Sequence, residues 1–425
     1  MSPQKARIRM YKVGFGDCFL LSFLYAADEK RHILIDFGTT KAPAGNPDLM
    51  QEIAEDVRAE TSGQLDVVVA THRHKDHVSG FSTTSKRDGP GDIIRSLKPR
   101  VVLLPWTEDP DTKEDAKVPT KTRDAHGLRK QLTHMHAVAE GALSFSQTAR
   151  AGVSEALRGR LAFLGEDNIK NVRAVKNLLT MGKECRYLYA GADAGVADVL
   201  PGVSVRVLGP PTLEQSEKIR KQRVSDREQF WMIAAASANV GAETASKPIF
   251  ARRFIAPDGE REEEVRWLTE RLSRAQAEQM LGIVTVLDNA MNNTSLILLF
   301  EVNGKKLLFP GDAQIENWEY ALSKADVVAK LADVDLYKVG HHGSRNATPR
   351  DLWNGFGKRS ANARSGDRLK TLLSTEAGKH GQESKHTEVP RTTLVDELKH
   401  KSEFHSTQAL QSDASMAFED IEVQF

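Results

Sequence analysis

Short apolar runs separated by glycine-rich turns dominate the first part of the chain. They predict strands at residues 8–13, 18–25, 32–36, 66–70 and 101–104. Continuous runs of Val, Ile and Leu of this length are typical of strands that are buried on both faces of a sheet. Apolar residues at helical spacing predict helices at 47–61 and 92–97. This part of the chain is therefore expected to be β-rich, with short helices between the strands.

The pattern changes twice further along the chain. Residues 107–186 and 214–285 carry apolar positions at helical spacing and many charges, which predicts two helical insertions. Strands are expected again at residues 187–190, 203–208, 295–301, 305–309, 335–339 and 371–374. Asn303-Gly304 predicts a hairpin turn, and residues 316–322 predict a helix. No further regular element is expected after residue 374.

These changes divide the chain into five segments. The first is a β-rich half that carries a histidine-rich loop, and the last is a second β-rich half that carries the remaining candidate ligands and a C-terminal segment. Between them lie a basic helical insertion, a pair of core strands and a second helical insertion. In chain order the boundaries are residues 1–106, 107–186, 187–213, 214–285 and 286–425.

Charge is nearly balanced over the whole chain but not locally. The 425 residues include 59 Lys and Arg against 58 Asp and Glu, a net charge of +1, which excludes a chain-wide polyanion-binding surface. Residues 113–186 contain 14 basic and 8 acidic residues, a local net charge of +6. This excess is either a solvated helical face or a positive wall beside an anionic substrate.

Cysteine content and hydropathy indicate the compartment. Only Cys18 and Cys185 are present, which excludes a disulfide framework and a cysteine-rich zinc module. The N-terminus enters a strand pattern without an apolar segment of the signal-peptide type, and no run of 18 apolar residues occurs. We therefore expect a cytoplasmic protein that does not interact with a membrane.

The strongest chemical signal is the segment of residues 71–77, here called the histidine loop. Directly after a predicted buried strand it brings together four side chains that can bind a metal, and these are His72, His74, Asp76 and His77. In a loop that leaves a strand, the first two can face one point and the last two a neighbouring point, which suits two ions. A solvated polar loop is the alternative.

Two further strand ends carry candidate ligands. Asp312 follows the predicted strand 305–309, and Gly311 before it permits close approach of the backbone. This carboxylate could bridge two cations, although Gly-Asp alone is only a turn signal. His341 and His342 follow strand 335–339. One of them could ligate the second ion while the other orients a ligand or substrate, and a structural histidine pair is the alternative.

These motifs resemble the metallo-β-lactamase superfamily, whose His-x-His-x-Asp-His motif stands here at residues 72–77. The chain is more closely similar to the hydrolase domain of ComEC-type competence proteins, and the segments that carry this resemblance are 13–18, 33–38, 292–296, 309–313 and 338–344. The resemblance implies an α/β fold, a four-layer αββα sandwich with metals at one edge. It also implies that Asp17 and Asp36 hold the ligating loops by hydrogen bonds, with turn capping as the alternative for each.

In the competence-type domains a histidine follows the strand that corresponds to residues 371–374 of this chain. His386 resembles it in position and could donate a proton to a leaving alkoxide. His380 lies nearby, and a surface histidine is the alternative for either. Asn292, Asn293 and Ser344 could hydrogen-bond substrate oxygens or shape their loops.

One family feature is missing from the chain. The third histidine of the first metal site has no clear counterpart between His77 and Asp312. The candidates that remain open are His126, His134, His136 and Asp193. The cofactor expected is Zn²⁺, as one or two ions, with Mn²⁺ as an alternative, since oxygen and imidazole ligands do not separate them.

Three functions fit this sequence. The first is hydrolysis of phosphodiesters, including DNA or RNA as anionic substrates, by a metal-bound hydroxide with Asp76 as an essential residue. The second is hydrolysis of another bond, such as a lactone, thioester or phosphocholine ester. The third is a non-catalytic metal-binding or regulatory module. The complete histidine loop, together with Asp312 and His341, argues against the third.

Overall fold

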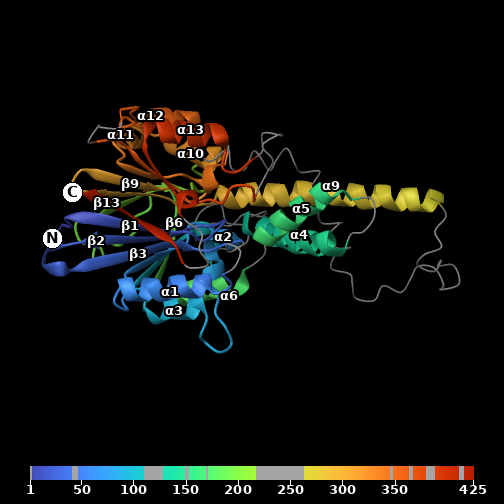
Figure 1. The fold of residues 1–425 in the computed structure, drawn as a ribbon, viewed down its shortest axis with the longest axis horizontal. Helices are drawn as coiled ribbons and strands as arrows, with labels where there is room; N and C mark the ends of the chain where they lie inside the picture. Colours follow the sequence, from blue (N-terminus) through green and yellow to red (C-terminus); the bar gives the residue numbers. More distant parts are fainter. Residues whose placement is uncertain are drawn as a thin grey trace.

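Two sheets packed face to face form the body of the protein, and helices cover both outer faces (Figure 1). The computed structural model describes residues 2–40, 46–109, 128–148, 153–168, 171–216, 263–344, 348–362, 367–379, 388–410 and 416–425. This arrangement confirms the predicted α/β fold with four layers in the order αββα.

The first sheet has seven strands, and the second half of it is parallel. In spatial order they are β13 (Phe418–Gln424), β1 (Lys5–Tyr11), β2 (Cys18–Leu24), β3 (Lys30–Phe37), β4 (Val67–Val69), β5 (Val101–Pro105) and β6 (Glu184–Leu188). The strands from β13 to β3 pair antiparallel, whereas those from β3 to β6 pair parallel. Parallel strands end at the same edge, so the loops after β3, β4 and β5 lie together.

The second sheet has six strands and repeats this layout. In spatial order they are β12 (Glu403–Ser406), β11 (Lys370–Leu373), β10 (Leu336–Lys338), β9 (Lys305–Phe309), β8 (Ile297–Val302) and β7 (Ser204–Gly209). The strands from β12 to β9 pair parallel, and β8 pairs antiparallel with both β9 and β7. The carboxyl ends of β9, β10 and β11 therefore also share one edge.

The C-terminal part contains more regular structure than the sequence predicted. The expectation that regular elements end with the strand at 371–374 is wrong, since helix α13 (Thr392–Lys401) and strands β12 and β13 follow it. β13 alternates buried and exposed residues and pairs with β1 at the edge of the first sheet. The alternation is visible in the sequence, but β1, the strand with which β13 pairs, lies at the opposite end of the chain.

The main core lies between the two sheets. Its aromatic centre includes Phe19 of the first sheet and Phe300 and Phe309 of the second, all almost fully buried. The Phe19 and Phe309 rings meet edge to face, with centroids 6.0 Å apart. Burial of side chains of this size contributes about 1.5–3 kcal/mol each, so this layer fixes the two sheets relative to each other.

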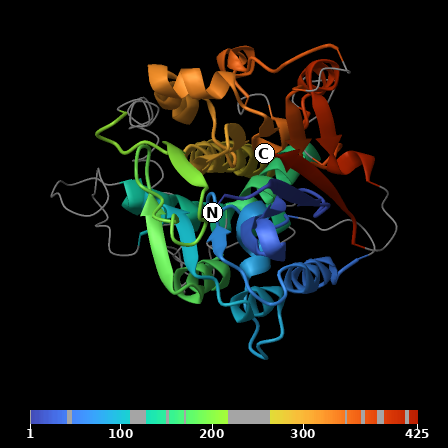
Figure 2. The same cartoon turned by 90° about the vertical axis from the view of Figure 1, so that its left-hand side faces the viewer.

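Helices cover the outer face of each sheet (Figures 1 and 2). The first sheet is covered by α1 (Leu49–Glu60), α3 (Pro90–Ser96) and α6 (Val172–Met181). The second is covered by α10 (Ile315–Leu322), α11 (Ala325–Ala332), α12 (Arg350–Gly355) and α13. Each helix buries one apolar face against a sheet, so these two layers complete the sandwich.

Three further helices form a unit that extends from the sandwich, here called the helical arm (Figure 1). They are α4 (Leu128–Thr148), α5 (Glu155–Asp167) and the long α9 (Glu263–Asn292). The arm has an apolar core of its own, which includes Ala139, Leu161 and Val284, and it meets the sandwich at Trp106. No helix in the described ranges is long and apolar enough to span a membrane.

Candidate metal centre

Three strand ends bring the candidate ligands to one edge of the sandwich. The histidine loop leaves β4 and turns into the short helix α2 (Lys75–Val78), while Asp312 follows β9 and His342 follows β10. Gly311 makes the approach possible, because it adopts a φ of +55° and a Cβ there would lie 2.7 Å from the Cβ of Thr71. A side chain at 311 would therefore push the histidine loop away from Asp312.

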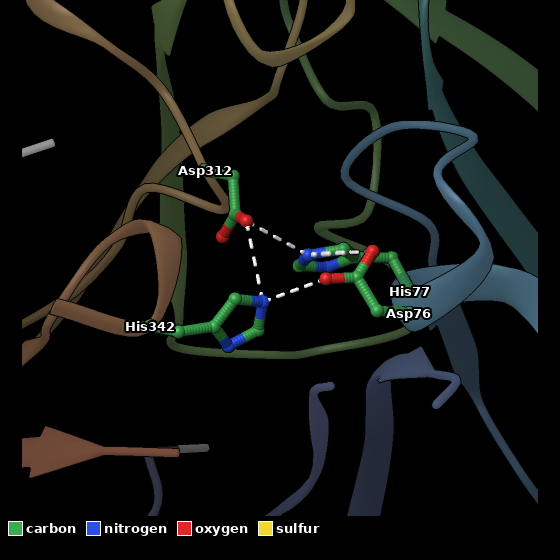
Figure 3. A group of neighbouring side chains, drawn as sticks. All are labelled: Asp76, His77, Asp312 and His342. Atoms are coloured by element: carbon green, nitrogen blue, oxygen red, sulfur yellow. Dashed lines mark hydrogen bonds and ion pairs between the residues drawn. The ribbon is translucent and has the colours of Figure 1, made fainter. Parts of the chain in front are cut away.

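One group of side chains joins both halves of the sandwich. Asp76, His77, Asp312 and His342 are all buried and offer ligand atoms within 4.8 Å of one another (Figure 3). Nε2 of His77 lies 3.1 Å from Oδ2 of Asp312, and Nε2 of His342 lies 2.7 Å from Oδ2 of Asp76. Nε2 of His342 is also 3.5 Å from the same Asp312 oxygen. Two imidazoles and two carboxylates thus converge on one point.

Within this group, three buried polar atoms make no hydrogen bond of good geometry, although two of them, on His77 and Asp312, lie at ion-pair distance from each other. They are Oδ1 of Asp76, Nε2 of His77 and Oδ2 of Asp312. Leaving such atoms unsatisfied costs about 1–3 kcal/mol each, and more if they are charged. A divalent cation would satisfy all of them, so the donor set fits a metal of the Zn²⁺ or Mn²⁺ type.

The charges of the group favour a cation as well. Burial alone would lower the pKa of His77, but the negative charges of Asp312 and Asp76 outweigh it and raise this pKa well above its usual value. The pKa of His342 is raised for the same reason, with Asp312 as the largest opposing charge. The carboxylates therefore attract positive charge strongly to this point.

Hydrogen bonds fix which nitrogen of each imidazole faces the group. Nδ1 of His77 donates to Oδ2 of Asp36 at 2.8 Å, and Nδ1 of His342 donates to the carbonyl oxygen of Ser374 at 3.0 Å. Each ring is thereby held with Nε2 toward Asp312. This is the usual arrangement of histidines that bind a metal.

Asp36 lies at the centre of this support. The register of β2 and β3 shifts at this point, and Asp36 adopts a φ of 55°, as at a β-bulge. The bulge turns its carboxylate toward the histidine loop, where it also accepts hydrogen bonds from the backbone N–H (2.7 Å) and the hydroxyl (2.8 Å) of Thr71. Asp36 thus anchors the loop at both Thr71 and His77.

A second group lies beside the first. Nε2 of His72 and Nδ1 of His74 face each other at 2.9 Å, and both side chains are buried together with Asp76. Burial, reinforced by the positive charge of His77, lowers the pKa of His72 well below its usual value. His72 is therefore neutral and can offer a lone pair to a metal.

Lys338 is a buried charge at the end of β10 to which the sequence analysis assigned no role. Its ammonium pairs with Asp17, lies 3.3 Å from Oδ1 of Asp312 and donates to the carbonyl oxygen of Gly311 at 3.2 Å. Burial opposes its charge, but Asp17 and Asp312 raise its pKa. The sequence did contain a signal for this role, which is a lysine within an otherwise apolar strand. Lysine is almost never fully buried unless it is paired with an opposite charge.

The two adjacent histidines have different surroundings. His342 belongs to the group with Asp76 and Asp312, whereas Nδ1 of His341 lies 2.8 Å from the hydroxyl of Ser344. The backbone N–H of His341 donates to Oδ1 of Asp312 at 3.0 Å. His341 therefore holds Asp312 through its backbone and places its ring beside Ser344.

The remaining candidates are distributed as follows. Asp193 is exposed and accepts a hydrogen bond from the backbone of Gly195, so it does not join either group. His134 and His136 lie on α4 in the helical arm. Three candidates lie outside the described residues, namely His126, His380 and His386. Nδ2 of Asn292 lies 3.4 Å from Asp288, and Asn293 donates to Glu316, so both amides have protein partners.

Two residues of the helical arm reach the histidine loop without having been predicted. Oδ1 of Asn168, at the end of α5, lies 2.9 Å from Nε2 of His74, and Oδ1 of Asp288, on α9, lies 3.9 Å from the same nitrogen. Both residues sit in charge-rich helical segments. No pattern in those segments distinguishes them from solvated polar residues.

Comparison with known proteins agrees with this geometry. Residues 12–152 match the family model of the metallo-beta-lactamase superfamily. The matched range includes strands β2 to β5 and the whole histidine loop. No curated protein matches the chain. The matched family and the His/Asp cluster together indicate a metal-dependent hydrolase.

Proposed function

We propose that this protein hydrolyses phosphodiester bonds, with nucleic acid as one candidate substrate. In this proposal the histidine loop, together with Asp312 and His342, holds the metal that the reaction needs. The observation that carries the proposal is the convergence of unsatisfied buried atoms from Asp76, His77 and Asp312 on one point. Such a group is costly to keep unless a cation completes it.

The chain offers ligands for two adjacent ions. His72 and His74 would hold one of them, and His77, Asp312 and His342 the other, while Asp76 belongs to both groups. A bound divalent ion of this type supplies a Lewis acid and lowers the pKa of a coordinated water. Zn²⁺ is the ion that we propose, with Mn²⁺ as the alternative.

The protein's own residues prepare the site for this chemistry. Asp36 fixes the histidine loop, and Lys338 neutralises part of the charge of Asp17 and Asp312. Because the ligands themselves are buried, electrostatic interactions with a substrate are screened little by bulk water. The backbone of His341 lies next to Asp312, and Ser344 lies next to the ring of His341. In this proposal these two side chains contact a substrate oxygen.

Three observations favour a phosphodiester over another bond. Residues 113–186 carry a local net charge of +6, which suits an anionic substrate. On α6, which begins next to the histidine loop, Arg173 and Lys176 are exposed. The motifs around Asp312 and His342 also resemble those of the competence-type hydrolases. In this proposal His386 donates a proton to the leaving alkoxide.

We also propose a reducing, cytoplasmic location. Cys18 is buried and Cys185 is half-buried, and neither is in a disulfide. Burial raises the pKa of both thiols, so both are expected to stay protonated and unreactive.

A substrate panel tests the proposed reaction. Purified protein with Zn²⁺ or Mn²⁺ is assayed on bis(p-nitrophenyl) phosphate, single-stranded DNA, double-stranded DNA, RNA, a lactone and a thioester. We expect hydrolysis of at least one phosphodiester, and a loss of at least about 100-fold in Asp76→Ala, comparable to removal of a major electrostatic contact. Activity confined to the lactone or thioester would replace the proposal with hydrolysis of another ester. Metal binding without any hydrolysis would favour a regulatory module.

A further inference from the structure

The end of α5 and the residue that begins α6 contact the histidine loop at three consecutive residues, 73–75. Nδ2 of Asn171, which precedes α6, donates to the carbonyl oxygen of Arg73 at 3.1 Å. The Lys75 ammonium pairs with Glu166 near the end of α5. Contacts on either side of His74 therefore come from the end of α5 in the arm and from the residue that begins α6.

The contact to His74 itself has a defined direction. Nδ2 of Asn168 donates to the carbonyl oxygen of Leu164 (3.0 Å) and to Oδ1 of Asp288 (3.1 Å). Turning the amide over would place its oxygen against these two acceptors, which is repulsive. The Asn168 oxygen must therefore face His74, and Nε2 of His74, 2.9 Å away, must be the protonated nitrogen.

A consequence follows for the other nitrogen of this ring. With the proton on Nε2, a neutral His74 carries its lone pair on Nδ1, the nitrogen that faces Nε2 of His72 at 2.9 Å. Two ring nitrogens then point at a common position, with Asp76 close by. The partner of the distal nitrogen is what normally fixes the tautomer of a metal-binding histidine.

Asp288 is well placed to orient Asn168. Its side chain is only 14% exposed, and its second oxygen lies 3.4 Å from Nδ2 of Asn292, one turn further along α9. The carboxylate is thus held from two sides. Oδ1 of this carboxylate also lies 3.9 Å from Nε2 of His74.

We propose that Asp288 and Asn168 are positioning residues of the metal centre, through which the helical arm holds His74 in the tautomer whose Nδ1 is available to a metal. The inference rests on the proposed metal-binding role of the histidine loop and deepens it. It assigns the arm a function in a site where the third histidine of the family has no clear counterpart. The affinity for the metal would then depend on how α5 and α9 pack against each other.

Calorimetric titration of chelator-treated protein with Zn²⁺ tests this role. We expect Asn168→Ala and Asp288→Ala to weaken one binding event by about 10–100-fold, the usual effect of removing a residue that orients a metal ligand. Asp288→Asn should lose less Zn²⁺ affinity than Asp288→Ala, because the amide oxygen of the new side chain can still accept a hydrogen bond from Asn168. Glu166→Gln is the matched control, since it removes an arm–loop contact without touching His74.

The outcomes separate the inference from the proposed function. If the wild-type protein binds no Zn²⁺, the metal-binding function and the inference both fail. If it binds Zn²⁺ and Asn168→Ala binds it equally well, only the inference fails. A loss in Glu166→Gln that equals the loss in Asn168→Ala would also overturn it, because docking of the arm alone would then explain the effect. Unfolding midpoints measured in chelator establish that each variant is folded.

The tautomer can be observed directly by ¹⁵N NMR of histidine-labelled, metal-free protein. The signal of His74 is identified by its absence in His74→Ala. We expect a protonated Nε2 in the wild type and a shift toward protonated Nδ1 in Asn168→Ala. A wild-type His74 that is protonated on Nδ1 would overturn the inference whatever the affinities are.

Discussion

Several charged side chains are buried at the edge of the sandwich that carries the candidate metal ligands. Asp17, Asp36, Asp76 and Asp312 are each at most 2% exposed, and Lys338 is the buried cation among them. A buried charge is tolerated only with a partner of opposite sign. Lys338 therefore supports the edge before any metal arrives, and the metal would add the remaining positive charge.

Replacing this lysine should be costly. We predict that Lys338→Met lowers the free energy of unfolding in chelator by about 3–5 kcal/mol, the usual cost of removing one partner of a buried pair. Lys306→Met is the control, because its partner Asp333 is 65% exposed and such pairs contribute less than about 1 kcal/mol. Urea unfolding measures both.

A second variant keeps this test informative if Lys338→Met fails to fold. Adding Asp17→Asn removes one of the stranded carboxylates and should restore part of the lost stability. Equal unfolding energies for the Lys338 and Lys306 variants would contradict the assigned role of Lys338.

His32 gives the protein a pH dependence that is separate from the metal edge. Burial, helped by the positive charges of Lys30 and Arg7, lowers its pKa to about 4, and its Nδ1 lies 2.8 Å from the hydroxyl of Ser22. The unfolded chain then binds a proton near pH 6.5 that the folded protein does not. This contribution to stability is complete above pH 6.5 and is lost as the pH falls toward 4.

The effect can be isolated with one substitution. Between pH 7.5 and pH 5 the wild type should lose about 2 kcal/mol more than His32→Asn, which keeps a polar partner for Ser22 but does not titrate. Urea unfolding of both proteins at both pH values measures this difference. The same loss in the two proteins would show that His32 titrates normally in the fold.

At the scale of elements, the contact between α4 and α5 holds the helical arm together. Gly165 of α5 is buried against α4, and a Cβ there would lie 2.9 Å from the backbone nitrogen of Leu143 and 3.0 Å from the carbonyl oxygen of Ala139. The close approach of these two helices therefore depends on the absence of a side chain at 165.

Two glycines of the same helix provide a matched pair. We predict that Gly165→Ala destabilises the arm by about 1–3 kcal/mol, because overpacking outweighs the gain in helix propensity of about 1 kcal/mol. Gly159 is exposed with no atom near its missing Cβ, so Gly159→Ala should instead stabilise α5 by up to about 1 kcal/mol. Hydrogen exchange of α4 and α5 measures both, and faster exchange in Gly159→Ala would refute this account.

The same scale shows what the sequence could and could not predict. Strand ends were predictable, because a short apolar run followed by polar residues marks them, as at Asp312 and His342. The contact between Asn168 and Asp288 was not, since these residues are 120 positions apart and meet only when α5 and α9 pack. β13 was missed because its pairing with β1 joins opposite ends of the chain.

At the scale of the whole molecule, the two sheets act as two halves of one site. The first sheet supplies the histidine loop and the second supplies Asp312 and His342, so the core between the sheets sets the distances between the ligands. The predicted four-layer fold is confirmed, and it explains why ligands far apart in the sequence meet. Helix α9 begins within the predicted second helical insertion. Its residue Asp288 lies 3.9 Å from His74 of the histidine loop.

The most direct test of this account is hydrolysis of bis(p-nitrophenyl) phosphate before and after removal of bound metal. We predict that chelator abolishes the activity of the wild type and that Zn²⁺ or Mn²⁺ restores it in a saturable manner. Asp312→Ala, measured in parallel, should remain inactive at every metal concentration, because its carboxylate is a member of the buried group with Asp76, His77 and His342. Hydrolysis that survives chelation, or that persists in Asp312→Ala, would contradict the assignment of this edge as the metal-dependent catalytic site.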